Sequence, residues 1–319
     1  MVRSDASATM RRQRRFIFHI LPLSIVALLG VGVFLFLRTF FSPIPFRQTV
    51  VIVSDPIHVV SFDAKNRKIT TVDIPLDTSI PAALGYGKYT VRALVSLDDI
   101  DHHNGSLISG SISNALGLPI SGYIRPDTAT DGPMTLEQLR HIFSYGSVPA
   151  VLMNRSHRSI EWVSWIRFVG SVGSMSADSW HPIQIAQAIV PMASPDGSTV
   201  PTLDESRVDY IIDTSFFDTG IRAEGTSVAV YNTTDVPSVG LRASRQMSRV
   251  GMQLIYVGNS DAVVKRCVVV GSDTLQKTKT AQFIKAYYGC EAKKDEGLGK
   301  ETGADIVVLL GTDFAARYK

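Results

Sequence analysis

With 319 residues and 45% hydrophobic side chains, the chain has room for a membrane segment and about two globular domains. Its hydrophobic content and its charged fraction of 19% exclude a wholly disordered polymer. Residues 1–15 hold five arginines and one aspartate, so the rest of the chain carries −1 of a total net charge of +3. This nearly neutral body excludes a nucleic-acid binder, because phosphate neutralisation needs a concentrated basic face.

An apolar run of 22 residues, Phe16–Leu37, follows the basic tail of residues 1–15. At about 1.5 Å per residue it can cross a bilayer core of about 30 Å, so it predicts a transmembrane anchor over 16–38. The arginine excess before it predicts a cytoplasmic N-terminus and an extracytoplasmic body at the cell membrane. A cleaved signal peptide is the alternative, but the run is long and Arg38-Thr39-Phe40-Phe41 offers no small-residue cleavage site.

Residues 39–48 form a short linker that contains two prolines, and an α/β domain is expected over 49–224. Its first part is rich in β-branched residues, which predict the strands Thr49–Val53, Ile57–Phe62 and Ile69–Ile74. The polar run between the last two strands predicts a hairpin turn. We expect the chemistry in the loop that follows, Ile74-Pro75-Leu76-Asp77-Thr78.

Helical spacing of apolar residues continues this domain. It predicts helices over Ser106–Leu116, Thr135–Phe143 and Ile160–Val169. Alternation around residues 89–93 predicts a strand on which Arg92 faces solvent. After Ser174, the clearest strand is Arg207–Asp213.

The last segment alternates strands and helices, which predicts a second, small α/β domain over 225–319 with helices packed on a sheet. The expected strands are 226–231, 254–258, 267–270 and 306–310, and the expected helices are 239–250 and 278–288. The run ADIVVLLG reads as a central strand that is buried on both faces.

Two cysteines, Cys267 and Cys290, fall in the part placed outside the cytoplasm, where disulfides persist. Cys267 begins a strand and Cys290 follows the helix that crosses back, so a disulfide between them is a hypothesis. It would close a loop of about 23 residues, worth about 3 kcal/mol in the chain-entropy model. Two unpaired buried thiols are the alternative.

Several further residues attract a functional interpretation. Adjacent His102 and His103 suggest a metal pair, but no further ligand spacing accompanies them, which favours a solvated loop. Trp162, Trp165 and Phe168 could line a groove for a lipid tail, although one aromatic stripe on a helix favours core packing. The arginines at 242, 245 and 249 share one helix face. This face could contact an anionic glycan, or it could simply be exposed to solvent.

The residues Ser54-Asp55 and HVVSFDAKNRKITTVDIPLDT resemble the first hairpin of the LytR-CpsA-Psr family, and LGLPISGYI resembles a later step of the same core. The stretch VAVYNTTDVPSVGLRASRQMSRVGMQLIYVGNSD and the strand ADIVVLLGTDF resemble the LytR C-terminal domain that often follows this core. The resemblance implies an α/β (α+β) fold, namely a single N-terminal transmembrane helix, a degenerate LytR-CpsA-Psr-like domain and a small C-terminal α/β domain.

Members of this family transfer an anionic glycopolymer from a polyprenyl-pyrophosphate carrier to peptidoglycan with the help of Mg²⁺. The resemblance implies that Asp55 and Asp77 are catalytic and magnesium-binding residues and that Lys88 matches the lysine of the family's K-I-N segment. Leu76 replaces the family arginine that contacts phosphate, and Thr90 replaces an asparagine. The family's later arginine-rich segment has no convincing match, although Arg155, Arg158 and Arg167 lie where it is expected.

Two functions follow from the resemblance. The first is a membrane-anchored phosphotransferase that acts in attachment of glycopolymers to the cell envelope. The second is a non-catalytic descendant, a pseudoenzyme that binds envelope polymers or acts as a scaffold, and the substitution at Leu76 keeps it open. As a bland alternative, Asp55 and Asp77 are ordinary turn residues. A transcriptional regulator is excluded, because the body is placed outside the cytoplasm and has no basic recognition surface.

Overall fold

The computed structural model describes residues 28–34, 46–126, 132–144, 159–160, 162–173, 175–193, 197–295 and 301–316. Contacts divide the chain into two compact units, 1–43 and 44–319. In the first unit, residues 28–34 are helical, and Leu28, Leu29 and Phe34 expose their side chains. Within the described ranges, no helix is both long and apolar enough for a membrane span. The rest of the predicted anchor, like Arg155 and Arg158, lies outside these ranges.

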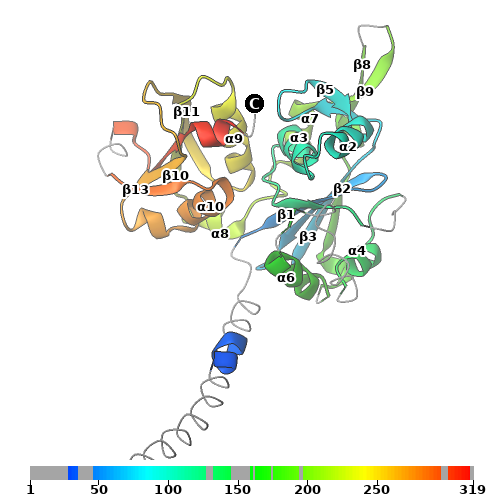
Figure 1. Ribbon diagram of the computed structural model, residues 1–319, viewed down its shortest axis with the longest axis horizontal. Helices are drawn as coiled ribbons and strands as arrows, with labels where there is room; N and C mark the ends of the chain where they lie inside the picture. The colour runs from blue at the N-terminus through cyan, green and yellow to red at the C-terminus, as the bar shows by residue number, and fades with distance from the viewer. Residues whose placement is uncertain are drawn as a thin grey trace, which may run out of the picture. The chain divides into compact units, whose positions relative to one another are not determined.

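The predicted hairpin forms the centre of the first sheet (Figure 1). β2 pairs antiparallel with β3, so that Ile57 lies opposite Ile74, and β1 pairs antiparallel with the other edge of β2. β6 and β7 add parallel to β1 and β3. The order is β6-β1-β2-β3-β7, with bounds β1 Gln48–Ile52, β2 Ile57–Asp63, β3 Lys68–Ile74, β6 Gly122–Ile124 and β7 Trp180–Ile183. The three strands predicted here are confirmed within one residue at each end.

Both faces of this sheet are buried, which explains the nearly continuous apolar runs of its strands. Val59 and Val72 belong to a core that α2 and α3 share, whereas Val60 and Phe62 belong to a core formed with α4 and α6. Figure 1 shows these two helix pairs on opposite sides of the sheet. Their bounds are α2 Val91–Ile100, α3 Ser106–Leu116, α4 Leu136–Ile142 and α6 Trp162–Gly173. The result is a helix–sheet–helix sandwich.

Local signals place two of these helices as expected. α3 has the predicted bounds and ends at Gly117, whose φ of 63° is the left-handed conformation that glycine adopts without strain. Thr135 begins α4 with a capping box, in which its side chain accepts from the backbone of Gln138. The core interpretation of the aromatic stripe is confirmed for Trp165 and Phe168, which are fully buried. The side chain of Trp162 lies outside the described part.

Two predicted strands are wrong, the first from Val91 onward and the second throughout, because those residues are helical. Residues 89–93 end β5 and begin α2, where the side chain of Thr90 caps the helix by accepting from Ala93 N. Arg207–Asp213 lies almost entirely within α7, Glu205–Ile212, which Asp204 caps by accepting from Arg207 N. In both segments the buried apolar residues lie three or four positions apart, which is helical spacing. The segments are short and contain β-branched residues, so their sequences also fit a strand.

A smaller sheet lies beside the first, and its strands have the order β5-β4-β9-β8. β4 connects directly to the hairpin through the loop Pro75–Thr78 and pairs antiparallel with β5. The elements are β4 Ser79–Pro81, β5 Lys88–Thr90, β8 Ile189–Ala193 and β9 Thr199–Leu203, with the short helices η3 Ala177–Ser179, η4 Ala186–Ala188 and α8 Thr219–Glu224.

The C-terminal domain is a second mixed sheet with the order β11-β10-β14-β12-β13. The prediction of a buried central strand is confirmed, since β14 lies between β10 and β12 and nearly all of its residues are buried. α9 and α10 cover one face and share its core. The elements are β10 Ser227–Asn232, α9 Val239–Arg249, β11 Gln253–Asn259, β12 Val268–Gly271, η5 Leu275–Lys277, α10 Lys279–Tyr288, β13 Glu291–Lys294, β14 Ile306–Leu310 and α12 Thr312–Ala315.

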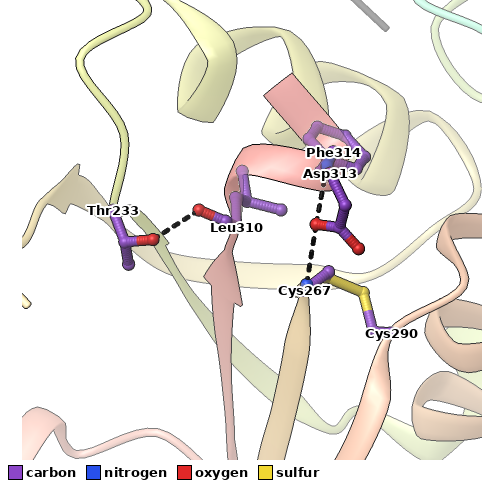
Figure 2. The surroundings of a disulfide bond; sticks show 6 residues. All are labelled: Thr233, Cys267, Cys290, Leu310, Asp313 and Phe314. Atoms are coloured by element: carbon purple, nitrogen blue, oxygen red, sulfur yellow. Dashed lines mark hydrogen bonds between the residues drawn. A yellow bond between two sulfur atoms is a disulfide. The ribbon is translucent and has the colours of Figure 1, made fainter. Parts of the chain in front are cut away.

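A disulfide joins Cys267 to Cys290 in this domain (Figure 2). Cys267 lies at the start of β12 and Cys290 directly before β13, and these two strands pair in parallel. Asp313 at the start of α12 accepts a hydrogen bond of 2.9 Å from Cys267 N. The disulfide and this bond therefore connect β12, β13 and the C-terminal helix at one end of the sheet.

Candidate functional site

The candidate site lies at the open end of the β2–β3 hairpin. Because Ile57 pairs with Ile74, Asp55 just before β2 and Leu76-Asp77 just after β3 emerge at the same end of the sheet. The loop that carries Asp77 is a turn closed by a 3.1 Å hydrogen bond from Thr78 N to Pro75 O. Asp55 and Asp77 are both exposed.

Arg92 brings a guanidinium to this end of the hairpin. Its backbone N donates to Leu76 O at 2.8 Å, which fixes the first turn of α2 against the loop. Its side chain then reaches back to Asp55, with 3.4 Å between Arg92 Nη2 and Asp55 Oδ2. The backbone of Arg92 is thus bonded to Leu76, the residue that replaces the family arginine, and its guanidinium pairs with Asp55. Sequence analysis placed Arg92 on a strand, and a helical interpretation of VRALVSLDDI behind the Thr90 cap would have placed it here.

The N-terminus of α2 does not offer free amides to an anion. Val91 N donates to Thr78 O, Arg92 N donates to Leu76 O, and Ala93 N donates to the Thr90 side chain. These groups are the amides that usually bind phosphate at a helix start. Positive charge at this site therefore comes from the side chain of Arg92, not from the helix backbone.

Lys88 lies apart from the two aspartates. It is exposed on β5 and pairs with Pro81, four residues along the chain from Asp77. Asp77 lies in the turn before β4, whereas Lys88 lies on β5 opposite the last residue of β4. No hydrogen bond or ion pair joins Lys88 to Asp55 or Asp77 in the described part of the chain.

The donor set at the hairpin end fits one mode of magnesium binding. Within the described ranges, no group of three or more His, Cys, Asp or Glu side chains could hold a metal ion. Mg²⁺ is, however, commonly held by one or two carboxylates together with substrate phosphates and water. Asp55 and Asp77 fit that shared mode and do not fit a site closed by protein ligands alone.

The hairpin also contains a histidine–aspartate pair that sequence analysis did not single out. His58 on β2 lies opposite Asp73 on β3, with 2.6 Å between His58 Nδ1 and Asp73 Oδ1. The His58 side chain is fully buried, and its Nε2 has no hydrogen-bond partner in the described part of the chain. The register of the predicted hairpin, which pairs residue 58 with residue 73, was the signal that could have found it.

The two adjacent histidines form no metal pair with a third ligand in the described residues. His102 is exposed at a turn, and His103 lies 2.9 Å from the hydroxyl of Tyr86 through its Nε2. Tyr86 also donates to Asp101 Oδ2 at 2.6 Å, and this bond raises the pKa of the tyrosine hydroxyl. The expected loop is thus present, with a side-chain network of its own.

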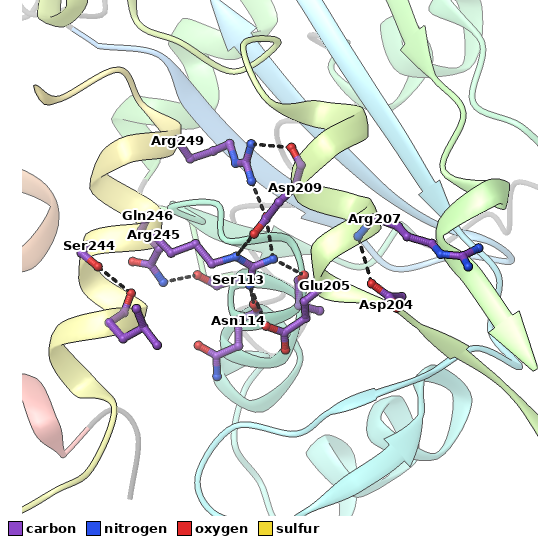
Figure 3. A network of polar contacts seen from close by, with 12 residues as sticks. Ser113, Asn114, Asp204, Glu205, Arg207, Asp209, Ser244, Arg245, Gln246 and Arg249 are labelled. Atoms are coloured by element: carbon purple, nitrogen blue, oxygen red, sulfur yellow. Dashed lines mark hydrogen bonds and ion pairs between the residues drawn. The ribbon is translucent and has the colours of Figure 1, made fainter. Parts of the chain in front are cut away.

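For two of the three arginines on α9, Arg245 and Arg249, both predictions from the sequence are wrong. Arg245 and Arg249 form ion pairs with Asp209 on α7, instead of facing solvent or a glycan (Figure 3). Arg245 also donates to the backbone carbonyls of Asn114 and Ala115 at the C-terminal end of α3. Arg249 is 6% exposed, and its burial lowers its pKa while Asp209 opposes that shift. Arg242 is exposed.

Two cavities, of about 440 and 430 Å³, open within the described part of the chain. The first lies between α3 and the C-terminal domain, and the second lies between residues 46–48, residues 119–121, α6 and α10. Asp55, Asp77, Lys88 and Arg92 line neither of them. The hairpin site is therefore separate from these two cavities, and Asp55 and Asp77 are exposed.

Comparison with known proteins identifies the C-terminal domain. Residues 225–314 match the family model LytR_C, described as LytR cell envelope-related transcriptional attenuator. No curated protein matches the chain.

Solved structures match the chain over about half its length. Bacillus subtilis TagV is 12% identical and covers 52% of this chain and 93% of its own, with a TM-score of 0.37. The LytR-CPS2A-psr family protein YwtF (TagT) of Bacillus subtilis, with bound octaprenyl pyrophosphate lipid, is 13% identical and covers 54% and 89%, with a TM-score of 0.36. The Lin1025 protein from Listeria innocua is 12% identical and covers 53% and 96%, with a TM-score of 0.35.

The family model matches the same strands and helices that carry the resemblance in the sequence, from the start of β10 to α12. The recognised resemblance is thereby confirmed for this part of the molecule: the chain carries a LytR C-terminal domain, the domain that often follows the LytR-CpsA-Psr core.

Proposed function

We propose that this chain acts in the attachment of glycopolymers to the cell envelope and binds the polyprenyl-pyrophosphate end of a lipid-linked glycopolymer at the open end of the β2–β3 hairpin. The observation that carries the proposal is the pairing of the Arg92 guanidinium with Asp55, while the backbone of Arg92 is bonded to Leu76. Arginine binds phosphate oxygens through paired N–H donors, so Arg92 supplies the contact that the leucine cannot.

In this proposal each residue has a separate task. Arg92 binds a phosphate oxygen, and Asp55 orients the guanidinium when the site is empty. Asp55 and Asp77 share a Mg²⁺ ion with the pyrophosphate, and that ion would offset the charge that develops during phosphoryl transfer. The exposed pair is worth no more than about 1 kcal/mol to stability, so Arg92 can exchange Asp55 for a ligand at little cost.

The second candidate, a non-catalytic polymer-binding or scaffold protein, is favoured by a different observation. Arg92 and Asp55 expose 64% and 55% of their side chains, and no described cavity includes them. Electrostatic stabilisation of a transition state is strong in sites that exclude water, and this surface does not. Binding of a ligand can use these exposed side chains as they are. Transfer needs water to be excluded, so the substrate itself would have to cover the site.

The proposed location is the outer face of the cell membrane, with residues 16–38 as a single-pass anchor. The length of the apolar run and the arginines before it support this placement. A reporter that is active only outside the cytoplasm, fused after Lys319, is expected to be active. An inactive outer reporter together with an active cytoplasmic one would reverse the topology.

The function is tested on the purified full chain in detergent with octaprenyl pyrophosphate and Mg²⁺. Arg92→Gln is expected to weaken binding at least about tenfold, the value of one charge-assisted hydrogen bond. Arg266→Gln is the matched control, because Arg266 forms an exposed ion pair with Glu291 in the C-terminal domain, away from the hairpin end. Equal affinities in the two variants and the wild type would refute the site.

Turnover separates the two candidates. With octaprenyl pyrophosphate, a transferase uses water as the acceptor: the P–O–P bond is cleaved, inorganic phosphate is released and octaprenyl phosphate is the leaving group. Asp55→Asn and Asp77→Asn are expected to abolish this activity while the lipid still binds. A scaffold binds the lipid in the wild type without any turnover. Failure of the wild type to bind the lipid at all would overturn both.

A further inference from the structure

The cavity of about 440 Å³ has walls from both domains. α3 contributes Ser106, Ser109 and Asn114, and the C-terminal domain contributes Gln246 and Tyr287. Its volume lies within the range of about 300–1,000 Å³ that small-molecule sites usually have. The cavity is therefore large enough for a ligand of one or two rings.

The chemistry of the walls selects an uncharged ligand. Every described residue that lines the cavity is uncharged, so a phosphate or carboxylate would lose its hydration without gaining a cation. Serine hydroxyls and the amides of asparagine and glutamine both donate and accept hydrogen bonds. Tyr287 and Phe314 add aromatic rings, on which the C–H faces of a sugar ring can pack.

Two polar atoms in the α3 wall lack partners. Ser109 Oγ and Asn114 Oδ1 are shielded from solvent, and neither forms a hydrogen bond with any described group. Buried oxygens without a partner are uncommon in native proteins, since leaving one unsatisfied costs about 1–3 kcal/mol. A ligand with hydroxyl groups could satisfy both after small side-chain rotations.

The walls are held together by hydrogen bonds across the cavity. Gln246 Nε2 donates to Ser113 Oγ at 2.9 Å, and the hydroxyl of Tyr287 donates to Ile120 O at 3.1 Å. The pairing of Arg245 with Asp209 anchors the same helix, α9. The cavity is thus formed before any ligand arrives, which lowers the entropic cost of binding.

We infer that this cavity binds a neutral sugar unit, so that the LytR C-terminal domain forms one wall of a saccharide site. The inference deepens the proposed function, on which it rests for the source of the sugar, because that sugar would belong to the lipid-linked glycopolymer. The pyrophosphate and the sugar then bind separate places, the charged hairpin end and the uncharged cavity.

The test is calorimetric titration of the full chain with two neutral disaccharides, N,N′-diacetylchitobiose and maltose, in a detergent without a sugar headgroup. Inorganic pyrophosphate is the anionic probe. Ser121→Trp fills the cavity from an exposed position that also lines the second cavity, and Ser96→Trp places the same side chain on an exposed serine of α2 outside both. Asn114 lines only the first cavity, so its variant assigns binding to that cavity. Asn114→Ala removes the unpaired amide while the helix backbone is kept.

We expect at least one disaccharide to bind, with affinity reduced more than tenfold by Ser121→Trp and unchanged by Ser96→Trp. Asn114→Ala should weaken binding about tenfold, the value of one hydrogen bond, without lowering the thermal unfolding temperature. A purely structural role of Asn114 would lower that temperature and leave the affinity unchanged.

The inference would be overturned if neither disaccharide binds at concentrations on the order of 10 mM, or if Ser121→Trp and the wild type bind equally well. It would also be overturned if pyrophosphate binds and Ser121→Trp abolishes that binding. Which disaccharide binds tells whether N-acetyl groups are recognised. Because the titration contains no polyprenyl pyrophosphate, its result is independent of the hairpin-site assay.

Discussion

The contact between the two domains depends on Arg245, and replacing this residue by methionine is the most direct test of how the molecule is held together. Its Nε and Nη2 donate to Asp209 at 2.8–3.0 Å. Its other hydrogen bonds go to the carbonyls of Asn114 and Ala115 and to Glu205 Oε2. The side chain is 18% exposed and Asp209 is 40% exposed. Methionine keeps the apolar stem and removes every donor.

The magnitude follows from these contacts. Hydrogen bonds to charged groups are worth about 1.5–3 kcal/mol each, but water also reaches both carboxylates, those of Asp209 and Glu205. Asp209 moreover keeps its ion pair with Arg249 in the variant. We therefore expect a loss of about 2 kcal/mol in the free energy that holds α9 on α7 and α3, rather than the sum of the individual bonds.

Hydrogen exchange of the α9 amides measures this free energy, because it reports local opening that a single unfolding curve of a two-domain chain would blur. Arg242→Met, at an exposed arginine on the same helix, is the control and should change this free energy less than Arg245→Met does. A double-mutant cycle with Asp209→Asn should give a coupling of about 1 kcal/mol. Equal protection in Arg245→Met and Arg242→Met would refute the reasoning.

Three further predictions concern stability. Replacing Cys267 and Cys290 by alanine should cost the C-terminal domain about 3 kcal/mol, the loop-closure value for a separation of 23 residues, measured by urea unfolding. Asp98→Ala should cost about 3 kcal/mol by thermal unfolding, because this buried carboxylate accepts from the amides of Gly105, Leu107 and Ile108 at the start of α3. Burial lowers the pKa of Arg47 to about 10, so the folded state releases this proton at a lower pH than the unfolded state does. The free energy of unfolding of the wild type should therefore rise by about 1 kcal/mol relative to that of Arg47→Met between pH 9 and pH 11.

Each of these has an outcome that contradicts it. An unchanged urea midpoint in the cysteine variant, or free thiols in the wild type by mass spectrometry without reductant, would count against the disulfide. If Asp98→Ala melts like Asp99→Ala, an exposed neighbour on the same helix, the capping role is wrong. A stability difference between wild type and Arg47→Met that stays constant with pH would show that burial does not shift this pKa.

Much of the fold was predictable because its signals are local. The β2–β3 hairpin combines β-branched runs with a polar turn, α3 ends at a glycine, and α4 begins with a capping box, so neighbours in sequence decide these elements. α2 and α7 were misjudged for the opposite reason. Their apolar runs are so short that they fit both the two-residue repeat of a strand and the 3.6-residue repeat of a helix. Only burial against the rest of the domain decides in favour of the helix.

In the candidate site, too, some residues could be found from the local sequence and others only from the tertiary structure. Asp55, Asp77 and the leucine at 76 could be found in the sequence, since they flank the ends of predicted strands. Arg92 could not be placed beside them, because its position depends on α2 being a helix and on the hydrogen bond from its backbone to Leu76. The His58–Asp73 pair depends on strand register in the same way.

The sequence by itself determined the order of the domains, the buried central strand of the C-terminal sheet and the chemistry available at the hairpin end. Only the tertiary structure decided that Arg245 and Arg249 face α7, and that an uncharged cavity lies between α3 and the LytR C-terminal domain. The physical reason is that periodicity and capping act within a few residues of chain. The partner of an exposed-looking arginine is chosen by a packing contact 36–40 residues away.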